Sequence, residues 1–384
     1  MEYRKFGPLD WEVSALGFGC MRLPTLDAND KIDEPEAIRM LRWAIDHGVN
    51  YLDTAYPYHG GQSEIVVGKA LQDGYRDKVR LATKLPTWAT NEYADFDRIL
   101  NEQLEKLQTD HIDFYLLHAL RRSSWEKVRD LDVLRWAESA MADGRIGHLG
   151  FSFHDTYEVF EEIVDAYDNW TFCQIQYNFI DLENQAGEKG LHYAADKGMA
   201  VVVMEPLLGG RLARPPKAVE ALWDSAEIER SPVEWALQWL WNQPEVTMLL
   251  SGMSTMQQVQ EDVTYASRSG VGKLSEDELA LVSQARDLYL ELSPVPCTQC
   301  RYCMPCPNGV NIPENFARYN TAALYDELED ARNWYAKADA DMLASACIQC
   351  RECEELCPQE IPISEWMPVV DEVLGQGQEL VRHL

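Results

Sequence analysis

Basic residues are scarce in this sequence. Lysine and arginine together number 34 against 64 acidic residues, which gives a formal net charge of −30 over 384 residues. Proteins that bind nucleic acid neutralise its phosphates with clusters of lysine and arginine, and the sequence has no such cluster. Nucleic acid is therefore excluded as a partner, whereas an acidic surface favours protein partners with basic patches.

Long apolar runs are missing as well. No apolar stretch approaches the ~18 residues that a membrane helix needs, and the opening residues have no uninterrupted apolar core of the kind found in secretion signals. We therefore expect no membrane association and a cytoplasmic location.

Cysteine, by contrast, is concentrated in two runs near the end of the chain. The first run consists of Cys297, Cys300, Cys303 and Cys306, and the second of Cys347, Cys350, Cys353 and Cys357, each followed by proline. Thiolates at this density hold iron–sulfur clusters in bacterial ferredoxins, where the fourth cysteine of each run binds the cluster of the other run. Structural zinc is an alternative, but zinc sites use four ligands in two pairs. Disulfides are another, but they require an oxidising compartment. We predict two [4Fe–4S] clusters.

Short apolar runs alternate with amphipathic stretches between residues 13 and 267. The predicted strands are residues 14–19, 50–55, 79–84, 112–118, 147–153, 172–177, 200–205 and 246–251. Predicted helices between them include residues 36–47, 96–107, 131–142, 156–167 and 232–241, the last with Ser231 as its cap. Eight strands alternating with helices predict an α/β fold, the (β/α)8 TIM barrel, with its chemistry at the carboxyl ends of the strands. The alternative, an open doubly wound sheet, requires a glycine fingerprint that residues 17–22 match only in part.

The composition changes after residue 270. Residues 275–290 are predicted to form one helix, and two prolines in residues 293–296 mark a boundary. Residues 313–346 favour helix and show no strand pattern. We therefore predict a barrel domain over residues 1–275 and a small all-helical, ferredoxin-like domain with both cysteine runs over residues 276–384.

Ionisable residues end three successive predicted strands: Asp53, Lys84 and His118. Tyr58 follows in the loop after Asp53, so a barrel brings all four to one rim. A lone tyrosine, with a pKa of ~10, is a weak acid at neutral pH. A neighbouring ammonium is expected to stabilise the phenolate and lower this pKa, with Asp53 fixing Lys84 and His118 orienting a substrate oxygen. The four residues suit proton transfer to a carbonyl oxygen.

With these residues in order, the barrel resembles the aldo-keto reductases. Residues 53–64 are similar to the signature stretch of that family, the four residues fall on its catalytic tetrad, and the opening residues look like its amino-terminal hairpin. The whole chain, with both cysteine runs, resembles the iron–sulfur-containing branch. The resemblance implies an NAD(P)H-dependent oxidoreductase acting on a small carbonyl or alcohol substrate.

The resemblance also implies which residues hold the nucleotide without a Rossmann fold. Ser152 and Gln174 match positions that bind the carboxamide, residues 207–211 match the loop around the pyrophosphate, and residues 251–262 match the segment at the adenosine end. The full implied set is Cys20, Met21, Asp53, Ser152, Gln174, Met204, Leu207, Gly209, Gly210, Arg211, Gly252, Ser254, Gln258 and Asp262.

The cation-bearing positions around a 2′-phosphate depart from the family pattern. The lysine and arginine that often clasp this phosphate align with Gly252 and Gln258, and Glu261 and Asp262 add negative charge nearby. Because a 2′-phosphate favours arginine or lysine, we expect NADH rather than NADPH, unless backbone amides at the start of the last barrel helix bind the phosphate.

How the two halves cooperate is left open by the sequence. Nicotinamide passes two electrons as hydride, whereas clusters pass one at a time. The clusters are expected to exchange electrons with the substrate, a flavin or an electron-transfer protein, to deliver two electrons together to an acceptor in the barrel, or to hold the helical module together. A different class of function, an electron carrier or redox sensor that uses the barrel as a scaffold, is the alternative. The implied ligand sets are Cys297, Cys300, Cys303 and Cys357 for one cluster and Cys347, Cys350, Cys353 and Cys306 for the other.

Overall fold

The computed structural model of the chain describes residues 1–26, 31–297, 299, 301–357 and 359–382, so the predicted ligand Cys300 lies outside the described residues. The chain divides into two compact units. The first comprises residues 1–178, 185–208 and 236–275, and the second comprises residues 179–184, 209–235 and 276–384.

Eight parallel strands close into a barrel in the first unit, in the order β10-β3-β4-β5-β6-β7-β8-β9. They are β3 (Leu16–Gly19), β4 (Tyr51–Asp53), β5 (Arg80–Leu85), β6 (Ile112–Leu120), β7 (Ile146–Phe153), β8 (Phe172–Gln176), β9 (Ala200–Met204) and β10 (Met248–Ser251). All eight predicted strands are confirmed, and the TIM barrel with them. The open-sheet alternative is wrong, because β10 pairs with β3 and leaves no edge.

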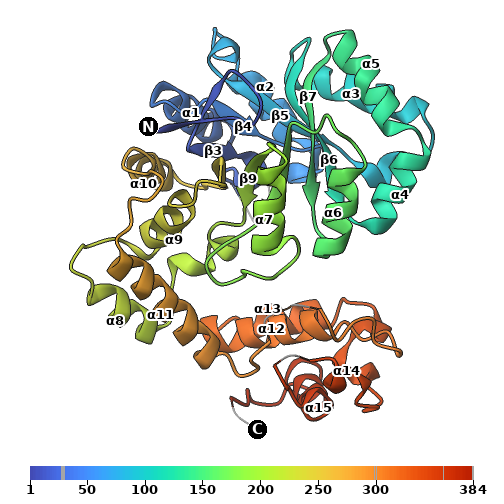
Figure 1. Cartoon of the computed structure of the whole chain (residues 1–384), viewed down its shortest axis with the longest axis vertical. Helices are drawn as coiled ribbons and strands as arrows, with labels where there is room; N and C mark the ends of the chain where they lie inside the picture. The colour runs from blue at the N-terminus through green and yellow to red at the C-terminus, as the bar shows by residue number, and fades with distance from the viewer. Residues whose placement is uncertain (27–30, 298, 300, 358, 383–384) are drawn as a thin grey trace. The chain divides into compact units, whose positions relative to one another are not determined.

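Helices cover the outside of the barrel, and Figure 1 shows α3 to α6 around strands β5 to β7. Between strands the chain forms α1 (Glu34–Asp46), α2 (Ser63–Ala70), α3 (Ala94–Leu107), α4 (Arg122–Asp130), α5 (Val133–Ala142), α6 (Tyr157–Asp165), α7 (Gly187–Asp196), α8 (Lys217–Asp224) and α9 (Pro232–Trp241), and α10 (Met256–Ala266) follows the last strand. Of these, α8 belongs to the second unit. The predicted cap is confirmed at the start of α9, where the Glu234 backbone N–H donates to Ser231 Oγ at 3.1 Å. None of the helices in the described parts of the chain has the length and apolar character needed to span a bilayer.

An antiparallel hairpin precedes the barrel and closes its amino-terminal end. Its strands are β1 (Tyr3–Lys5) and β2 (Glu12–Ser14). Phe6, fully buried at the end of β1, lies with its ring centroid 4.6 Å from that of Phe114 and 5.6 Å from that of Phe172. Phe172 is the first residue of β8, so these aromatic rings fill the amino-terminal end of the barrel. Ligand access is therefore expected at the carboxyl ends of the strands, where barrels carry their active sites.

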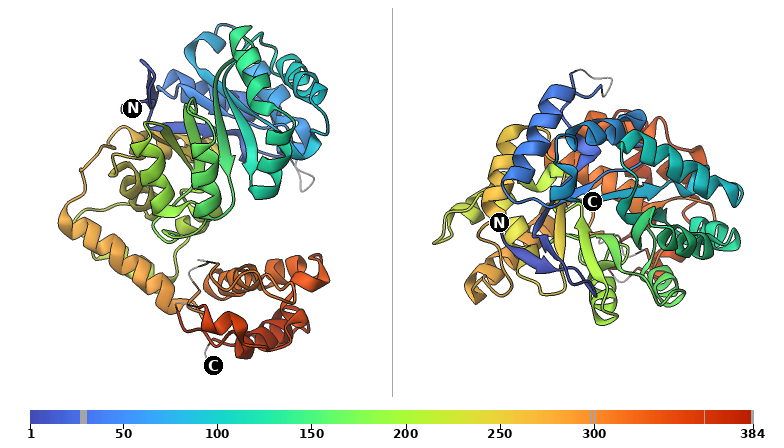
Figure 2. Two further views of the ribbon diagram at one scale, coloured as in Figure 1. Left: turned by 45° about the vertical axis from the view of Figure 1, so that its right-hand side comes forward. Right: turned by 90° about the horizontal axis from the view of Figure 1, so that it is seen from above.

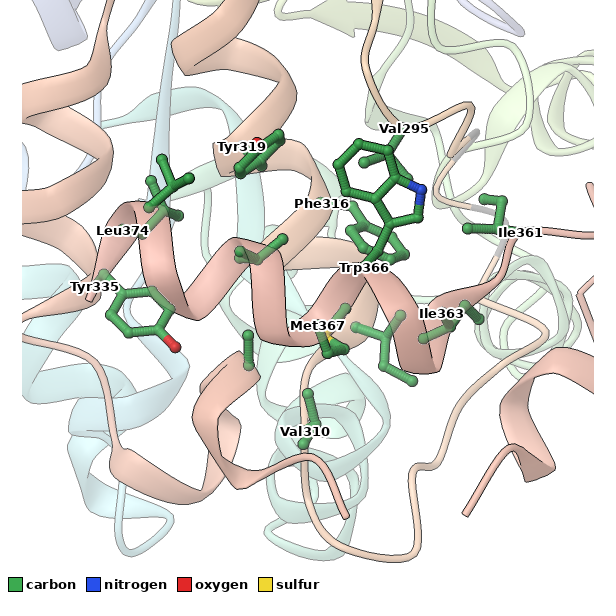
Figure 3. Packing of buried hydrophobic residues seen from close by; sticks show 14 of the residues in the cluster. Val295, Val310, Phe316, Tyr319, Tyr335, Ile361, Ile363, Trp366, Met367 and Leu374 are labelled. Carbon is green, nitrogen blue, oxygen red and sulfur yellow. The ribbon is translucent and has the colours of Figure 1, made fainter. Parts of the chain in front are cut away.

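The second unit is helical. After residue 275 it contains α11 (Glu276–Leu292), α12 (Ile312–Tyr325), α13 (Leu328–Tyr335), α14 (Glu352–Glu355) and α15 (Ile363–Leu374), and no strand occurs among the residues described there. Figure 2 shows α11 as one long uninterrupted helix. Figure 3 shows Trp366 and Met367 of α15 beside Phe316 of α12 and Val295, all of them buried. The predicted helical module is confirmed, with its own apolar core.

Two segments from between the barrel strands cluster with this helical module in the second unit. The ring centroid of Phe179 lies 6.2 Å from that of Tyr289 in α11, and Arg230 pairs with Glu278 of the same helix. The sequence gives no sign of this association, because the contacts join residues far apart in the chain. The predicted domain boundary after residue 275 stays a prediction.

Candidate active site and cysteine pockets

Lys84 lies at the centre of the predicted tetrad. Its ammonium donates to Asp53 Oδ1 at 2.5 Å, to the backbone oxygen of Thr54 at 2.8 Å and to the hydroxyl of Tyr58 at 3.4 Å. These contacts use all three of its N–H donors. Burial opposes the charge of Lys84, but Asp53 and Tyr58 outweigh this, so the pKa of Lys84 lies above its ordinary value. The ammonium is charged at any physiological pH.

His118 completes the group of four. Its ring lies edge-on to that of Tyr58, with centroids 6.1 Å apart. Burial, together with the charge of Lys84, holds the pKa of His118 well below its usual value, so the imidazole is neutral. Among the described residues its buried Nδ1 atom has no hydrogen-bond partner. The structure thus brings Asp53, Tyr58, Lys84 and His118 together, as the sequence predicts.

The expected fall in the pKa of Tyr58 is wrong. Burial raises this pKa, and the charge of Lys84 opposes the rise without overcoming it. Desolvation disfavours a phenolate more than one ammonium at 3.4 Å favours it. Tyr58 is consequently protonated at neutral pH and holds a proton that it can donate.

Behind Lys84 lies a buried polar layer that the sequence analysis missed. Gln103 Nε2 donates to the backbone oxygen of Lys84 at 3.0 Å and to Glu64 Oε1 at 2.7 Å. The hydroxyl of Thr83 donates to the same Glu64 oxygen at 2.7 Å. The available signal was Gln103 itself, a polar residue on the face of α3 that also carries the buried Ile99, Leu100 and Leu107. Its partners, however, come from elements that only the fold brings together.

Three predicted nucleotide contacts lie at neighbouring strand ends. Ser152 Oγ accepts the backbone N–H of Ala119 at 2.7 Å. Gln174 Nε2 lies 3.7 Å from the sulfur of Met204, while its buried Oε1 atom has no hydrogen-bond partner among the described residues. A buried amide oxygen without a donor is costly. The site therefore fits a ligand that offers an N–H group, as a carboxamide does.

In the segment after β10, side chains of the segment itself make hydrogen bonds with its polar groups. Gln258 Oε1 accepts the backbone N–H groups of Ser254 and Thr255, at 2.7 and 3.2 Å. Ser251 donates to the buried carboxylate of Asp262 at 2.7 Å. Gln258 thus occupies amides that were expected to be available for a phosphate.

Arg22 is a cation that the sequence analysis overlooked. A Cβ atom added at Gly252 would lie 3.3 Å from Arg22 Cβ, and the hydroxyl of Ser254 donates to the Arg22 backbone oxygen at 2.8 Å. Arg22 belongs to the short turn after β3, which also carries the buried Cys20 and the exposed Met21. Closure of the barrel between β10 and β3 brings this exposed arginine to the 252–262 segment. Burial raises the pKa of the Cys20 thiol, so this side chain is a thiol and not a thiolate at neutral pH.

The remaining predicted contacts follow β9. Leu207 precedes the turn, and Gly209 and Gly210 have φ of 67° and 91°, the left-handed region that favours glycine. In the second unit, Arg211 donates to Glu327 Oε2 at 3.3 Å.

The two cysteine runs meet in the second unit. Cys297 and Cys303 of the first run line one pocket with Cys357 of the second. Conversely, Cys306 of the first run interacts electrostatically with Cys347 and Cys353 of the second, and both of those interact with Glu354. The described residues hold no trio of His, Cys, Asp or Glu placed around a single metal ion. The exchange of the last cysteine of each run fits the crossed arrangement of ligands expected for two clusters.

Comparison with known proteins decides the family. Residues 15–287 match the model of the aldo/keto reductase family, which is more than half of the chain. The chain belongs to the aldo/keto reductase family. Residues 296–361 match the 4Fe-4S dicluster domain, so this aldo/keto reductase continues into an iron–sulfur segment that contains both cysteine runs.

Relatives of this aldo/keto reductase cover its barrel. The uncharacterized oxidoreductase YqkF of Bacillus subtilis is 27% identical over 325 residues, which span 75% of this chain and 98% of that protein. The aldo-keto reductase AKR11C1 of Bacillus halodurans, in its holo form, is similar with a TM-score of 0.62 and 28% identity, over 74% of this chain and 96% of the other. An aldo-keto reductase of Klebsiella pneumoniae in complex with NADPH has a TM-score of 0.59 and 25% identity, over 74% and 95% of the two chains. The chain is thus an oxidoreductase of the aldo-keto reductase type.

Asp262 gives this reductase a pH-dependent stability. Burial raises its pKa to about 7. Because the folded state binds this proton more tightly than the unfolded state, stability falls as the pH rises from about 4 to about 7, by up to about 4 kcal/mol. We expect Asp262→Asn, which keeps an acceptor for Ser251, to remove this decline in denaturant unfolding measured at acidic and alkaline pH. The exposed variant Asp77→Asn should retain it, and an unchanged decline in Asp262→Asn would contradict the assignment.

Proposed function

We propose that this reductase transfers hydride between NADPH and a small carbonyl or alcohol substrate, with Tyr58 as the proton donor in the direction of carbonyl reduction. The chain of contacts from Asp53 through Lys84 to Tyr58, beside a neutral His118, is the observation that carries the proposal. The electron-carrier alternative gives no reason for a buried, fully satisfied ammonium next to a tyrosine hydroxyl.

Each residue of the four has a separate task. Tyr58 holds its proton at neutral pH and donates it to the carbonyl oxygen. The charged Lys84 stabilises the phenolate that remains, and Asp53 keeps Lys84 charged and in place. His118 hydrogen-bonds the same substrate oxygen and orients it. Bound NADPH supplies the hydride.

We assign Trp88 to the substrate pocket, where its indole would form one wall. Its indole is 53% exposed and lies 5.2 Å from the His118 ring, centroid to centroid. Lys127 donates to the backbone oxygens of Thr87 and Trp88, at 3.2 and 3.4 Å, so the loop that carries the indole is fixed. A rigid, exposed aromatic face beside the reacting group favours substrates with an apolar substituent on the carbonyl carbon.

NADPH is proposed rather than the NADH expected from the sequence. The expectation depended on the missing cations at Gly252 and Gln258, yet Arg22 lies against Gly252. The Klebsiella relative was solved with NADPH, which supports this choice. We assign to Ser152 and Gln174 the carboxamide, and to Arg22 a phosphate of the dinucleotide.

For the iron–sulfur segment we propose two [4Fe–4S] clusters with the crossed ligand sets. One is held by Cys297, Cys300, Cys303 and Cys357, and the other by Cys306, Cys347, Cys350 and Cys353. The shared pocket of Cys297, Cys303 and Cys357 supports the first set. The exposed thiol of Cys350 gives the second cluster an approach for an electron-transfer protein.

Tyr58→Phe tests the proton donor. We expect turnover of a carbonyl substrate to fall about 10²–10⁴-fold, the usual contribution of a general acid, with the dissociation constant of NADPH unchanged. Steady-state kinetics and a separate fluorescence titration measure the two quantities. Tyr56→Phe is the matched control, because its hydroxyl donates to Glu102 and not to Lys84. Undiminished turnover in Tyr58→Phe would exclude the proposed role.

Arg22→Gln tests the choice of nucleotide. An arginine–phosphate contact contributes about 1.5–3 kcal/mol, so we expect NADPH binding to weaken about 10- to 100-fold and NADH binding to weaken less. Equilibrium titrations with both nucleotides give the ratio, and Arg39→Gln, an exposed arginine paired with Glu36, is the control. Equal losses of affinity for NADPH and NADH would indicate that Arg22 contacts the pyrophosphate instead. No loss of either affinity would show that Arg22 does not bind the nucleotide.

An anaerobic titration tests how the clusters receive electrons. Hydride donation passes two electrons at once and each cluster takes one, so we expect NADPH alone to leave the visible cluster absorbance unchanged, whereas dithionite bleaches it. The protein should contain about eight iron ions, as two [4Fe–4S] clusters require. Bleaching by NADPH would instead show that the barrel feeds the clusters and would contradict an external electron donor.

A further inference from the structure

The two cysteine runs are built on one repeated pattern. Both read Cys-x-Gln-Cys-Arg-x-Cys, at residues 297–303 and 347–353. Gln299 and Gln349 have φ of 58° and 57°, and Arg301 and Arg351 have φ of 65° and 67°. Left-handed backbone is uncommon for residues other than glycine. The two arginines therefore start from equivalent places, and a difference between them must come from their surroundings.

Arg351 is neutralised. Its side chain is exposed, and its Nε atom lies 2.8 Å from Glu354 Oε2. The other oxygen of Glu354 accepts the backbone N–H and the hydroxyl of Ser364, at 2.7 and 2.6 Å. This carboxylate is fixed beside the second cysteine run, where it interacts with Cys347 and Cys353.

Arg301 is not neutralised. It is half-buried and lines the pocket that Cys297, Cys303 and Cys357 share. Within the described parts of the chain, no Asp or Glu forms an ion pair with it. The rest of this pocket is largely apolar, from Ile312, Phe316, Ile361 and Ile363. A charge next to apolar walls is screened less than a charge in water.

We propose that Arg301 raises the reduction potential of the cluster held by Cys297, Cys300, Cys303 and Cys357 above that of the other cluster. This inference rests on the ligand sets given under the proposed function. One-electron reduction adds a negative charge to a cluster that four thiolates already make anionic, and an arginine cation, which stays protonated, stabilises the added charge. At the second cluster, Glu354 cancels the equivalent arginine. A one-electron donor would therefore reduce the first cluster before the second, and the first cluster would hold the electron.

A redox titration of the purified holoprotein, followed by electron paramagnetic resonance, tests this. We expect two successive one-electron reductions in the wild type. In Arg301→Gln the higher midpoint should fall, by about tenfold in the reduction equilibrium or about 59 mV. Glutamine already occupies the same left-handed backbone at residue 299, so this substitution adds no strain of its own. Arg301→Lys, which keeps the charge, should keep the midpoint. Arg351→Gln also removes one positive charge, but solvent screens this exposed side chain, so the lower midpoint should shift by less.

The result that overturns the proposal is a full complement of iron in Arg301→Gln with both midpoints unchanged. If that variant does not assemble its clusters, Glu354→Gln provides the mirror experiment. It keeps an oxygen acceptor for Ser364 but frees the charge of Arg351, so the lower midpoint should rise; no rise would also overturn the proposal. Wild-type protein without iron would contradict the proposed clusters themselves, which separates the failure of the two proposals.

Discussion

The ammonium of Lys84 and the carboxylate of Asp53 lie 2.5 Å apart, with their side chains 1% and 3% exposed. Burial of two charges is costly, and their attraction offsets the cost only when the remaining donors and acceptors are satisfied. The backbone oxygen of Thr54 and the hydroxyl of Tyr58 accept hydrogen bonds from the other two N–H groups of Lys84, whereas the buried Oδ2 atom of Asp53 has no partner among the described residues. An apolar pair of the same size would be no less stable. The pair is therefore explained by the charge that it keeps beside Tyr58 and not by stability.

The barrel explains how this pair is held. Asp53 of β4 stands opposite Ala82 of β5, and Lys84 follows Ala82 by two residues. Because side chains alternate along a strand, Lys84 shares the face of Ala82, one step nearer the carboxyl end. Phe6 and its aromatic neighbours fill the opposite end of the barrel. Strand register thus places the charge of Lys84 beside Asp53, and the hairpin that closes the amino-terminal end leaves the carboxyl ends of the strands for substrate access.

The eight strands and the positions of the four tetrad residues could be predicted from the sequence. Each strand is marked by a local apolar run, and each tetrad residue lies at the end of one such run or in the loop that follows it. Arg22 was missed because its neighbour Gly252 is 230 positions away and meets it only where β10 closes on β3. The pKa of Tyr58 was expected with the wrong sign because the sequence shows the ammonium but not the desolvation that outweighs it. The association of residues 179–184 and 209–235 with α11 depends on the ring contact between Phe179 and Tyr289 and on the ion pair between Arg230 and Glu278, which no local sequence pattern predicts.

The iron–sulfur segment depends on the same kind of long-range closure. Cys297 and Cys357 are sixty positions apart, and they share a pocket because the core around Phe316 and Trp366 brings both ends of the segment together. A cluster bound there would link the two ends covalently, so its assembly and the packing of α12 on α15 would stabilise each other. A structural role and an electron-transfer role of the clusters are then compatible. The proposed ligation would complete the fold and would also place each cluster in its own electrostatic environment, next to Arg301 in one case and next to the Arg351–Glu354 pair in the other.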